Sequence, residues 1–415
     1  MTDDPVVEDP TTAAAPVGPT AEEARARRTA ARRGATRFLL GHGDIAPSAW
    51  LAELAAATTE EDLDRYGEGG EVEALEREVA ELLGQEAAVL MPSGIMAQQA
   101  ALRSWADRSS TEAVAVHGLS HLVVHELDAL PELHGLRLQR LTSEPRQPTV
   151  ADLDALAGPL AAVTLELPLR DAGYLLPTWD ELVAFSAAVR ARGVPLHLDG
   201  ARLWESTDHL GHSLAEVCAL ADSVYVSFYK GLGGMAGAVL AGPADLVAEA
   251  RRWQRRHGGN LFVLLPYAVG ARDGLRRRLP LMPAYAERAR ELAAGLAALD
   301  GVRVNPDPPH TNAFQLYVDV AHGDLAEAGL RIAGPGAAIP GLSNTLSAQF
   351  DIPVEFGTTP DTVKVLFEHE AGELVLGLFE GSQRMTLLPP SSRRFTISLA
   401  SPAFHAFPFS PLRLL

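Results

Sequence analysis

Lys230 is one of two lysines in this 415-residue chain, in which Lys and Arg together number 35; the other is Lys364. It follows the alternating apolar residues Val224, Val226 and Phe228, and a glycine-rich run comes directly after it. Alternation of period two predicts a strand, and glycines let the backbone turn tightly behind it. An uncharged lysine amine can attack an aldehyde to form a Schiff base, whereas arginine does not release its proton. Lys230 is therefore a candidate nucleophile, with an ordinary solvated lysine as the alternative.

A second set of chemical groups ends the apolar run VPLHLDGAR at 194–202. Asp199 comes at the end of a predicted strand, and Arg202 lies three residues after Asp199. A carboxylate at a strand end can pair with a pyridinium nitrogen, which makes that ring a better electron sink. Arg202 can form a forked contact with a substrate carboxylate or a ring oxygen. The alternative is that Asp199 and Arg202 simply pair in a loop.

A third feature is the turn in VLMPSGIMAQQAAL, which leads from a predicted strand into a predicted helix. The N–H groups at a helix N-terminus form an anion site, so Ser93, Gly94 and Ile95 could hold one phosphate. The turn lacks the spacing of dinucleotide fingerprints and of P-loops. An ordinary connection between strand and helix is the alternative.

Three histidines recur every four residues in HGLSHLVVHE, at His117, His121 and His125. On one helix they would share a face and could bind zinc. Histidines with a purely structural role are the other interpretation from spacing alone.

These residues need a scaffold that brings strand ends together, and the wider pattern provides one. Short apolar runs at 86–94, 112–118, 160–167, 194–200, 222–230 and 237–243 alternate with helical patterns such as 70–84, 95–106 and 178–193. This alternation favours an α/β fold with a mainly parallel sheet, whose ligands bind at the carboxyl ends of strands. We predict a large domain at 36–270 and a smaller one at 271–415. Segment 363–381 is compatible with strands or a helix.

Composition narrows the classes of function. The net charge of −18 argues against nucleic-acid binding, and no apolar run is long enough to span a membrane. The single cysteine, Cys218, excludes an internal disulfide and is expected to be a small core residue. Residues 1–20 are acidic and rich in Pro, Ala and Thr, and the charged stretch at 21–33 could be a helix or an extension of the same tail. This composition predicts a disordered tail at 1–35 in a cytoplasmic protein.

The order of phosphate turn, Asp-Gly-Ala-Arg and Lys-Gly-Leu-Gly resembles the threonine aldolase and β-eliminating lyase family of fold type I pyridoxal phosphate enzymes. The run RYGEGGEVEALEREVAELLGQEAAVLMPSG is similar to the family's sequence before its phosphate turn. The resemblance implies a seven-stranded-type, mainly parallel sheet flanked by helices, with a smaller C-terminal α+β domain. It implies that Lys230 forms the Schiff base with pyridoxal 5'-phosphate and that Asp199 pairs with the pyridine nitrogen. It also implies phosphate contacts from Gly94 and Ile95, and a cofactor or substrate contact from Arg202.

The same resemblance assigns further residues. His121, followed five residues later by Glu126, corresponds to a histidine that stacks on the pyridine ring and relays protons. Arg255 corresponds to a basic residue that reaches a neighbouring subunit's phosphate, which implies a homodimer or homotetramer. Arg394 corresponds to an arginine that holds the substrate carboxylate. The family's Glu-Asn-Thr-His segment is replaced by ELPLRDAG, and its N-terminal serine has no clear match.

The function implied is a threonine-aldolase-like retro-aldol cleavage of a β-hydroxy-α-amino acid to glycine and an aldehyde, with no metal. β-Elimination, racemisation and transamination are related outcomes of the same site. The replaced segments motivate a different hypothesis, a cofactor-binding homologue that serves as a non-catalytic partner subunit. Metal-dependent hydrolysis through the spaced histidines is a third hypothesis.

Overall fold

The computed structural model describes residues 45–59 and 62–317 in full, and it gives the backbone of Val318 and of five strands beyond it. Residues 22, 23 and 26 are also described as helical and exposed. The rest of the predicted N-terminal tail lies outside the described residues.

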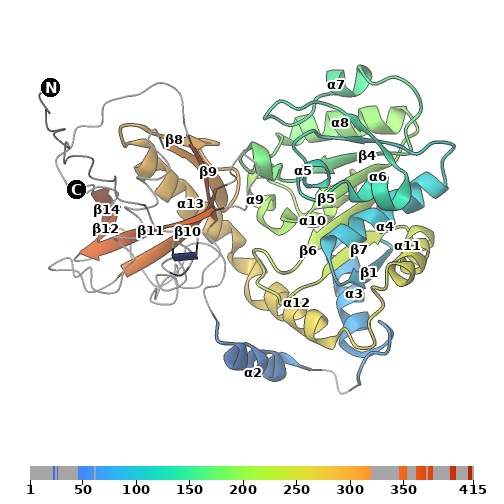
Figure 1. The fold of residues 1–415 in the computed structure, drawn as a ribbon, viewed down its shortest axis with the longest axis horizontal. Helices are drawn as coiled ribbons and strands as arrows, with labels where there is room; N and C mark the ends of the chain where they lie inside the picture. Colours follow the sequence, from blue (N-terminus) through green and yellow to red (C-terminus); the bar gives the residue numbers. More distant parts are fainter. Residues whose placement is uncertain are drawn as a thin grey trace, which may run out of the picture.

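A seven-stranded sheet forms the centre of the larger part of the molecule (Figure 1). Its strand order is β1-β7-β6-β5-β4-β2-β3, and β7 alone runs antiparallel to its neighbours. The strands are β1 (Ala87–Met91), β2 (Ala113–Val116), β3 (Arg137–Arg140), β4 (Ala162–Glu166), β5 (Leu196–Gly200), β6 (Ser223–Ser227) and β7 (Ala238–Gly242). The predicted α/β class and the six predicted strands are therefore confirmed. The edge strand β3 was not predicted.

Helices cover both faces of this sheet (Figure 1). They are α2 (Pro47–Ala57), α3 (Gly70–Leu83), α4 (Gly94–Asp107), α5 (His121–Val124), α6 (Ala129–His134), α7 (Val150–Asp154), α8 (Trp179–Ala191), α9 (Thr207–Leu210), α10 (Leu214–Cys218), α11 (Ala244–Arg256), α12 (Leu265–Arg277) and α13 (Met282–Ala297). Single 3₁₀ turns occur at η1 (Arg170–Ala172), η2 (Leu203–Glu205) and η3 (Leu279–Leu281). One face carries α4 and α11, and the opposite face carries α3, α8 and α10.

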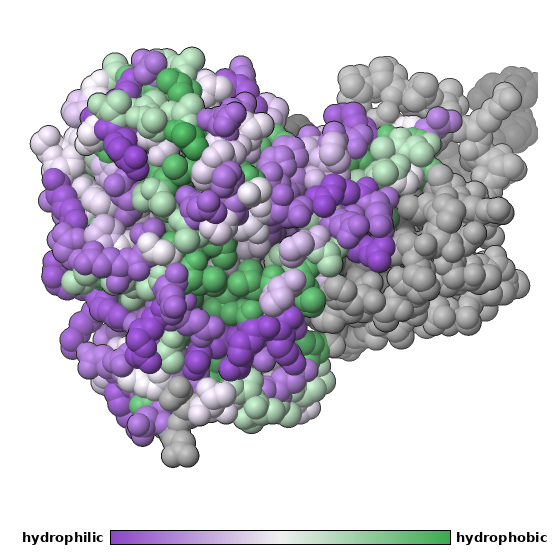
Figure 2. Space-filling model, turned by 180° about the vertical axis from the view of Figure 1, so that it is seen from behind, coloured by the Kyte–Doolittle hydropathy of each residue, from purple (hydrophilic) through white to green (hydrophobic). Residues whose placement is uncertain are grey.

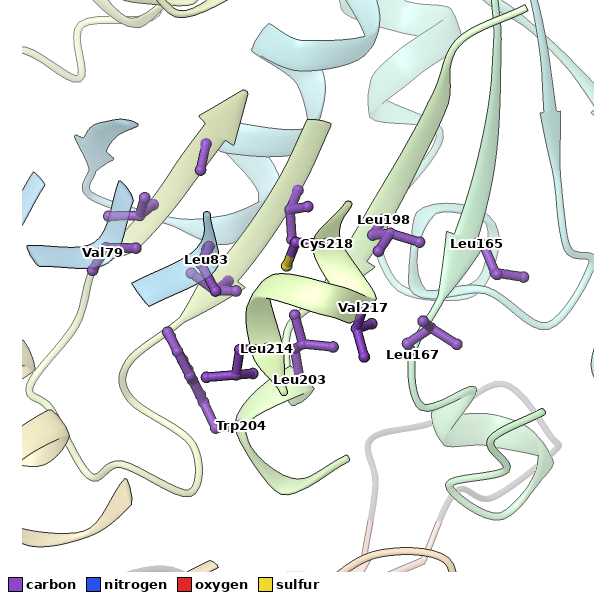
Figure 3. Packing of buried hydrophobic residues seen from close by; sticks show 14 of the residues in the cluster. Val79, Leu83, Leu165, Leu167, Leu198, Leu203, Trp204, Leu214, Val217 and Cys218 are labelled. Atoms are coloured by element: carbon purple, nitrogen blue, oxygen red, sulfur yellow. The ribbon is translucent and has the colours of Figure 1, made fainter. Parts of the chain in front are cut away.

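The apolar spacing that predicted the helices also builds the core. On α3, residues Val79 and Leu83 point toward the packed interior in Figure 3, and Gly84 ends the helix in the left-handed conformation. Trp204 and Cys218 belong to the same cluster, and both are almost completely buried. Burial raises the pKa of the Cys218 thiol to about 12, so this residue is an inert core residue as predicted.

A second sheet lies beside the first, with strand order β14-β12-β11-β10-β13-β9-β8. The strands are β8 (Val302–Asn305), β9 (Ala313–Val318), β10 (Thr345–Ile352), β11 (Asp361–Glu370), β12 (Glu373–Leu376), β13 (Arg393–Ser398) and β14 (Ser410–Arg413). Within segment 363–381, the described residues 363–370 and 373–376 lie in strands β11 and β12. The α+β character of the C-terminal part agrees with the prediction.

The division at residue 270 stays a proposal. The helix α12 crosses this position, and α13 contacts both β9 of the second sheet and the turn η2 of the larger part. Figure 2 shows the molecule from behind. The described part of this face is largely hydrophilic, and hydrophobic residues gather near its centre. Within the described ranges, every helix is too short or too polar to span a lipid bilayer.

Candidate active site

Lys230 lies just beyond β6, at the carboxyl edge of the parallel strands. Strand β5 lies next to β6 in the sheet. It ends with Asp199 and Gly200, which pair in register with Tyr225 and Val226 of β6. The two candidate residues therefore leave the sheet at the same edge. Burial of the amine, reinforced by the nearby positive charge of Arg202, lowers the pKa of Lys230 to about 8. The amine is thus far more often uncharged at neutral pH than that of an ordinary lysine.

Asp199 is buried and is held by two hydrogen bonds. The side-chain amide of Gln98 donates to Oδ2 at 2.6 Å, and the Ala201 N–H donates to Oδ1 at 3.1 Å. Gln98 lies on the buried face of α4, and its Oε1 has no hydrogen-bond partner among the described residues. The sequence analysis did not single out Gln98. A polar residue on the inward face of an amphipathic helix was the available signal.

The predicted phosphate turn is formed as expected at the start of α4. Ser93 caps the helix, because its Oγ accepts from the Met96 N–H at 3.3 Å. The Gly94 and Ile95 N–H groups belong to the first helical turn, which has no intrahelical acceptors. Gly94 also allows close packing, since a Cβ at this position would lie 1.9 Å from the Tyr225 hydroxyl.

Ser227 is a further candidate for this anion site. It ends β6 two residues after Tyr225, so both side chains project from the same face of the strand. Its hydroxyl is fully buried, and within the described structure no partner forms a hydrogen bond of normal geometry with it. The sequence analysis did not single out Ser227.

Arg202 and Glu205 form a partly paired group beside Lys230. Arg202 Nη1 lies 3.6 Å from Glu205 Oε1, and the guanidinium lies 5.3 Å from the centre of the Tyr174 ring. Arg202 Nε has no hydrogen-bond partner in the described ranges. Burial raises the pKa of Glu205 to about 7, although Arg202 opposes this shift. Arg202 therefore keeps donor capacity for an anionic ligand.

His121 is fixed through both its ring and its backbone. Its Nδ1 lies 3.0 Å from Glu126 Oε1, and its N–H donates to Glu166 Oε2 at 2.7 Å. Burial raises the pKa of Glu126, and the His121 partner opposes this rise. Glu166 ends β4 opposite Asp199, and burial together with that neighbouring carboxylate raises its pKa to about 8. The replaced segment ELPLRDAG thus still supplies a carboxyl group to the site.

Two predicted positions have no described contact with this cluster. Arg255 is exposed on α11, and no described contact joins it to Lys230. Arg394 lies on β13 opposite Tyr317 of β9, and its side chain is outside the described residues. Both assignments stay predictions.

The three evenly spaced histidines do not share a helix, because α5 spans only His121–Val124. His117 precedes it in a loop, where Nδ1 accepts from the Leu119 N–H and Nε2 lies 3.0 Å from the Arg146 carbonyl. Among the residues that the structure describes, no group of three or more His, Cys, Asp or Glu side chains could hold a metal ion. The histidine spacing therefore gives no support to a zinc face.

Residues 45–321 match the family model of the beta-eliminating lyases, which is more than half of the chain. The chain belongs to the beta-eliminating lyase family. All the candidate residues from Gly94 to Arg255 fall within the matched range. The family resemblance drawn from the turn, the aspartate and the lysine is confirmed.

Comparison with solved structures agrees with this membership. An Exiguobacterium protein, named as an aromatic amino acid beta-eliminating lyase/threonine aldolase, is 41% identical, with a TM-score of 0.71, over 74% of this chain and 86% of its own. A Listeria monocytogenes protein, named as an L-allo-threonine aldolase, is 34% identical, with a TM-score of 0.74, over 93% of this chain and 95% of its own. The architecture is that of the fold type I pyridoxal phosphate-dependent enzymes, as predicted.

Among the curated relatives, an aldolase of Penicillium aethiopicum is 36% identical over 222 residues. The match covers 51% of this chain and 56% of the fungal protein, so the chain spans little more than half of that relative's length.

Proposed function

We propose that this beta-eliminating lyase is a pyridoxal phosphate-dependent enzyme that cleaves a β-hydroxy-α-amino acid to glycine and an aldehyde. The observation that carries the proposal is a lysine of lowered pKa beside a buried aspartate at the carboxyl edge of the sheet. The Listeria relative, named as an L-allo-threonine aldolase, supports the same reaction.

The residues present fit the cofactor. Asp199 is held by Gln98 and Ala201 in a buried position, which suits a partner for a protonated ring nitrogen. The N–H groups of Gly94 and Ile95, with the buried Ser227 hydroxyl, suit a phosphate. When bound, pyridoxal phosphate supplies an electron sink for the bond to Cα that breaks. Covalent attachment falls to the amine of Lys230, because its lowered pKa leaves it uncharged more often.

Arg202 is the best-placed described group for the substrate carboxylate. Its Nε has no partner within the described ranges, and its contact with Glu205 is a long one of 3.6 Å. A guanidinium can take a carboxylate through two parallel N–H donors. We also keep Arg394 as a proposed second carboxylate ligand from the C-terminal part.

Proton transfer is assigned to Lys230 and His121. With the substrate bound, the Lys230 amine would hold the proton that is delivered to Cα of the glycine product. The His121 ring is oriented by Glu126, and its backbone is held by Glu166, so it presents a fixed imidazole for stacking and for relaying protons.

We further propose a homodimer or homotetramer in the cytoplasm. The exposed position of Arg255 on α11 suits a contact with a neighbouring subunit's phosphate, as the resemblance implied. The lone buried thiol of Cys218 suits a reducing compartment.

The test is product analysis with wild-type protein, pyridoxal phosphate and a panel of β-hydroxy amino acids that includes threonine, allo-threonine and phenylserine. We expect equal amounts of glycine and aldehyde from wild type and none from Lys230→Ala. Formation of ammonia and a 2-oxo acid would instead show β-elimination. Bound cofactor without turnover of any substrate would favour a non-catalytic partner subunit.

A further inference from the structure

A second histidine–carboxylate pair lies beside the first, and the proposed function above does not use it. His125 follows α5, and its Nε2 lies 2.6 Å from Oδ2 of Asp171 on the turn η1. The rings of His121 and His125 have centroids 5.2 Å apart and are tilted by 43°. Two imidazoles, each with its own carboxylate, therefore occupy one small region.

The two pairs share an arrangement in which the acid is buried and the ring is accessible. The side chains of Glu126 and Asp171 are 1% and 10% exposed, whereas those of His121 and His125 are 29% and 31% exposed. No hydrogen bond from the described part of the chain reaches the second nitrogen of either ring. Each ring thus keeps one nitrogen for a ligand.

This arrangement is what a proton-transfer histidine requires. A carboxylate next to Nε2 of His125 favours the tautomer with the proton on Nε2, which leaves a lone pair on Nδ1. The same carboxylate stabilises the imidazolium formed when Nδ1 accepts a proton. Burying a carboxylate costs desolvation free energy, and a contact with a partly exposed ring contributes little stability in return. A contribution to folding stability alone therefore explains the pair poorly.

Backbone hydrogen bonds connect the second pair to the active site. Glu166 Oε1 accepts from the N–H of Arg170, the residue before Asp171, at 3.0 Å. Its other oxygen accepts from the His121 N–H, and Glu166 stands opposite Asp199 in the sheet. One buried carboxyl group thus positions both histidine pairs next to the aspartate proposed for the cofactor ring.

We propose that His125, oriented by Asp171, accepts the proton of the substrate's β-hydroxyl group, while His121 lies against the cofactor. This inference rests on the proposed function and assigns one step within it. The O–H proton passes to Nδ1 of His125, and the O–H electron pair forms the C=O bond of the aldehyde. The Cα–Cβ bond breaks, its electron pair stays on Cα, and a proton delivered to Cα completes glycine. The titratable or charged groups around this step include His121, Glu126, Glu166, Arg170 and Asp171, together with Asp199 and Lys230.

The test compares two reactions of the full-length protein loaded with pyridoxal phosphate. One is the cleavage of threonine or phenylserine, which requires loss of the hydroxyl proton. The other is exchange of the glycine Cα proton with deuterated solvent, followed by NMR, which involves no hydroxyl group. We expect His125→Asn to lower kcat for cleavage by about 10²-fold or more and to leave glycine exchange within about twofold of wild type.

Asp171→Asn should give a smaller loss of cleavage than His125→Asn and leave glycine exchange near wild type, because it acts through the orientation of His125. His212→Asn is the matched control, since His212 is 32% exposed and also faces a carboxylate, Glu216, at 3.5 Å. It should change neither reaction. Thermal unfolding of each variant checks that the fold is kept, and His125→Gln replaces His125→Asn if the latter unfolds.

Equal cleavage by wild type and His125→Asn would overturn the role of His125 and leave the proposed function standing. An equal loss of cleavage and of glycine exchange would also overturn it, because a merely structural pair disturbs both reactions. No cleavage by wild type of any β-hydroxy amino acid would overturn the proposed function together with this inference.

Discussion

The rate at which Lys230 captures pyridoxal phosphate should rise with pH and reach a plateau at about pH 8. Burial and the Arg202 charge lower the pKa of this amine from 10.5 to about 8. At pH 7 about one amine in ten is then uncharged, against about one in 3,000 for an ordinary lysine, a gain of roughly 300-fold. Only the uncharged amine attacks an aldehyde, so the observed rate should follow this fraction.

In the assay, apoprotein is mixed with pyridoxal phosphate at a series of pH values from about 6 to about 10. The reaction is quenched with borohydride, and the pyridoxyl groups bound to the protein are then quantified by mass spectrometry. The rate should rise about tenfold per pH unit and level off near pH 8. The variant Lys230→Ala retains only Lys364 and measures background capture.

Arg202→Gln should move the plateau to higher pH, because the variant removes a neighbouring positive charge that disfavours the charged amine. The overall rate of this variant is not the readout, since Arg202 is also a proposed ligand. A wild-type rate that still climbs at about pH 10 would refute the lowered pKa. An unchanged plateau in Arg202→Gln would refute the contribution of Arg202.

Three further substitutions test individual residues that form or surround the site. Gly94→Ala should weaken cofactor binding and destabilise the fold by about 1–3 kcal/mol, measured by titration and urea unfolding, because its Cβ would collide with the Tyr225 hydroxyl. Gln98→Leu should cost the apoprotein about 1.5–3 kcal/mol, since the buried Asp199 loses a charge-assisted hydrogen bond. Glu205→Gln should stabilise the apoprotein by up to about 3 kcal/mol at pH 8, because the folded-state pKa of about 7 lies above the ordinary 4.5. Wild type loses this stability as pH rises from about 4.5 through about 7, so in paired unfolding curves the gain should vanish below about pH 4. A gain that is independent of pH would contradict the assignment to the Glu205 carboxyl.

The sequence alone predicted those site residues that lie at the ends of strands. Lys230 and Asp199 follow apolar runs, and Gly94 follows another, so the period of the pattern placed all three at one edge of a sheet. That reasoning uses only local order along the chain. It also located Cys218 in the core, because a lone cysteine in an apolar helical pattern has no polar role to fill.

The rest depends on contacts between segments that are distant in the chain. Gln98 meets Asp199, and His125 meets Asp171, only after the helices dock on the sheet. No spacing rule encodes these pairs. The edge strand β3 has the sequence RLQR, which lacks the apolar character that marks a buried strand.

The central claim is that Lys230 binds pyridoxal phosphate covalently and that this attachment is required for cleavage. The direct measurement is peptide mapping of borohydride-treated holoenzyme by mass spectrometry, alongside glycine release by wild type and Lys230→Ala. We predict one reduced pyridoxyl group, on the peptide that contains Lys230, and loss of both the adduct and glycine release in the variant. An adduct on Lys364, no adduct at all, or cleavage that survives in Lys230→Ala would contradict the claim.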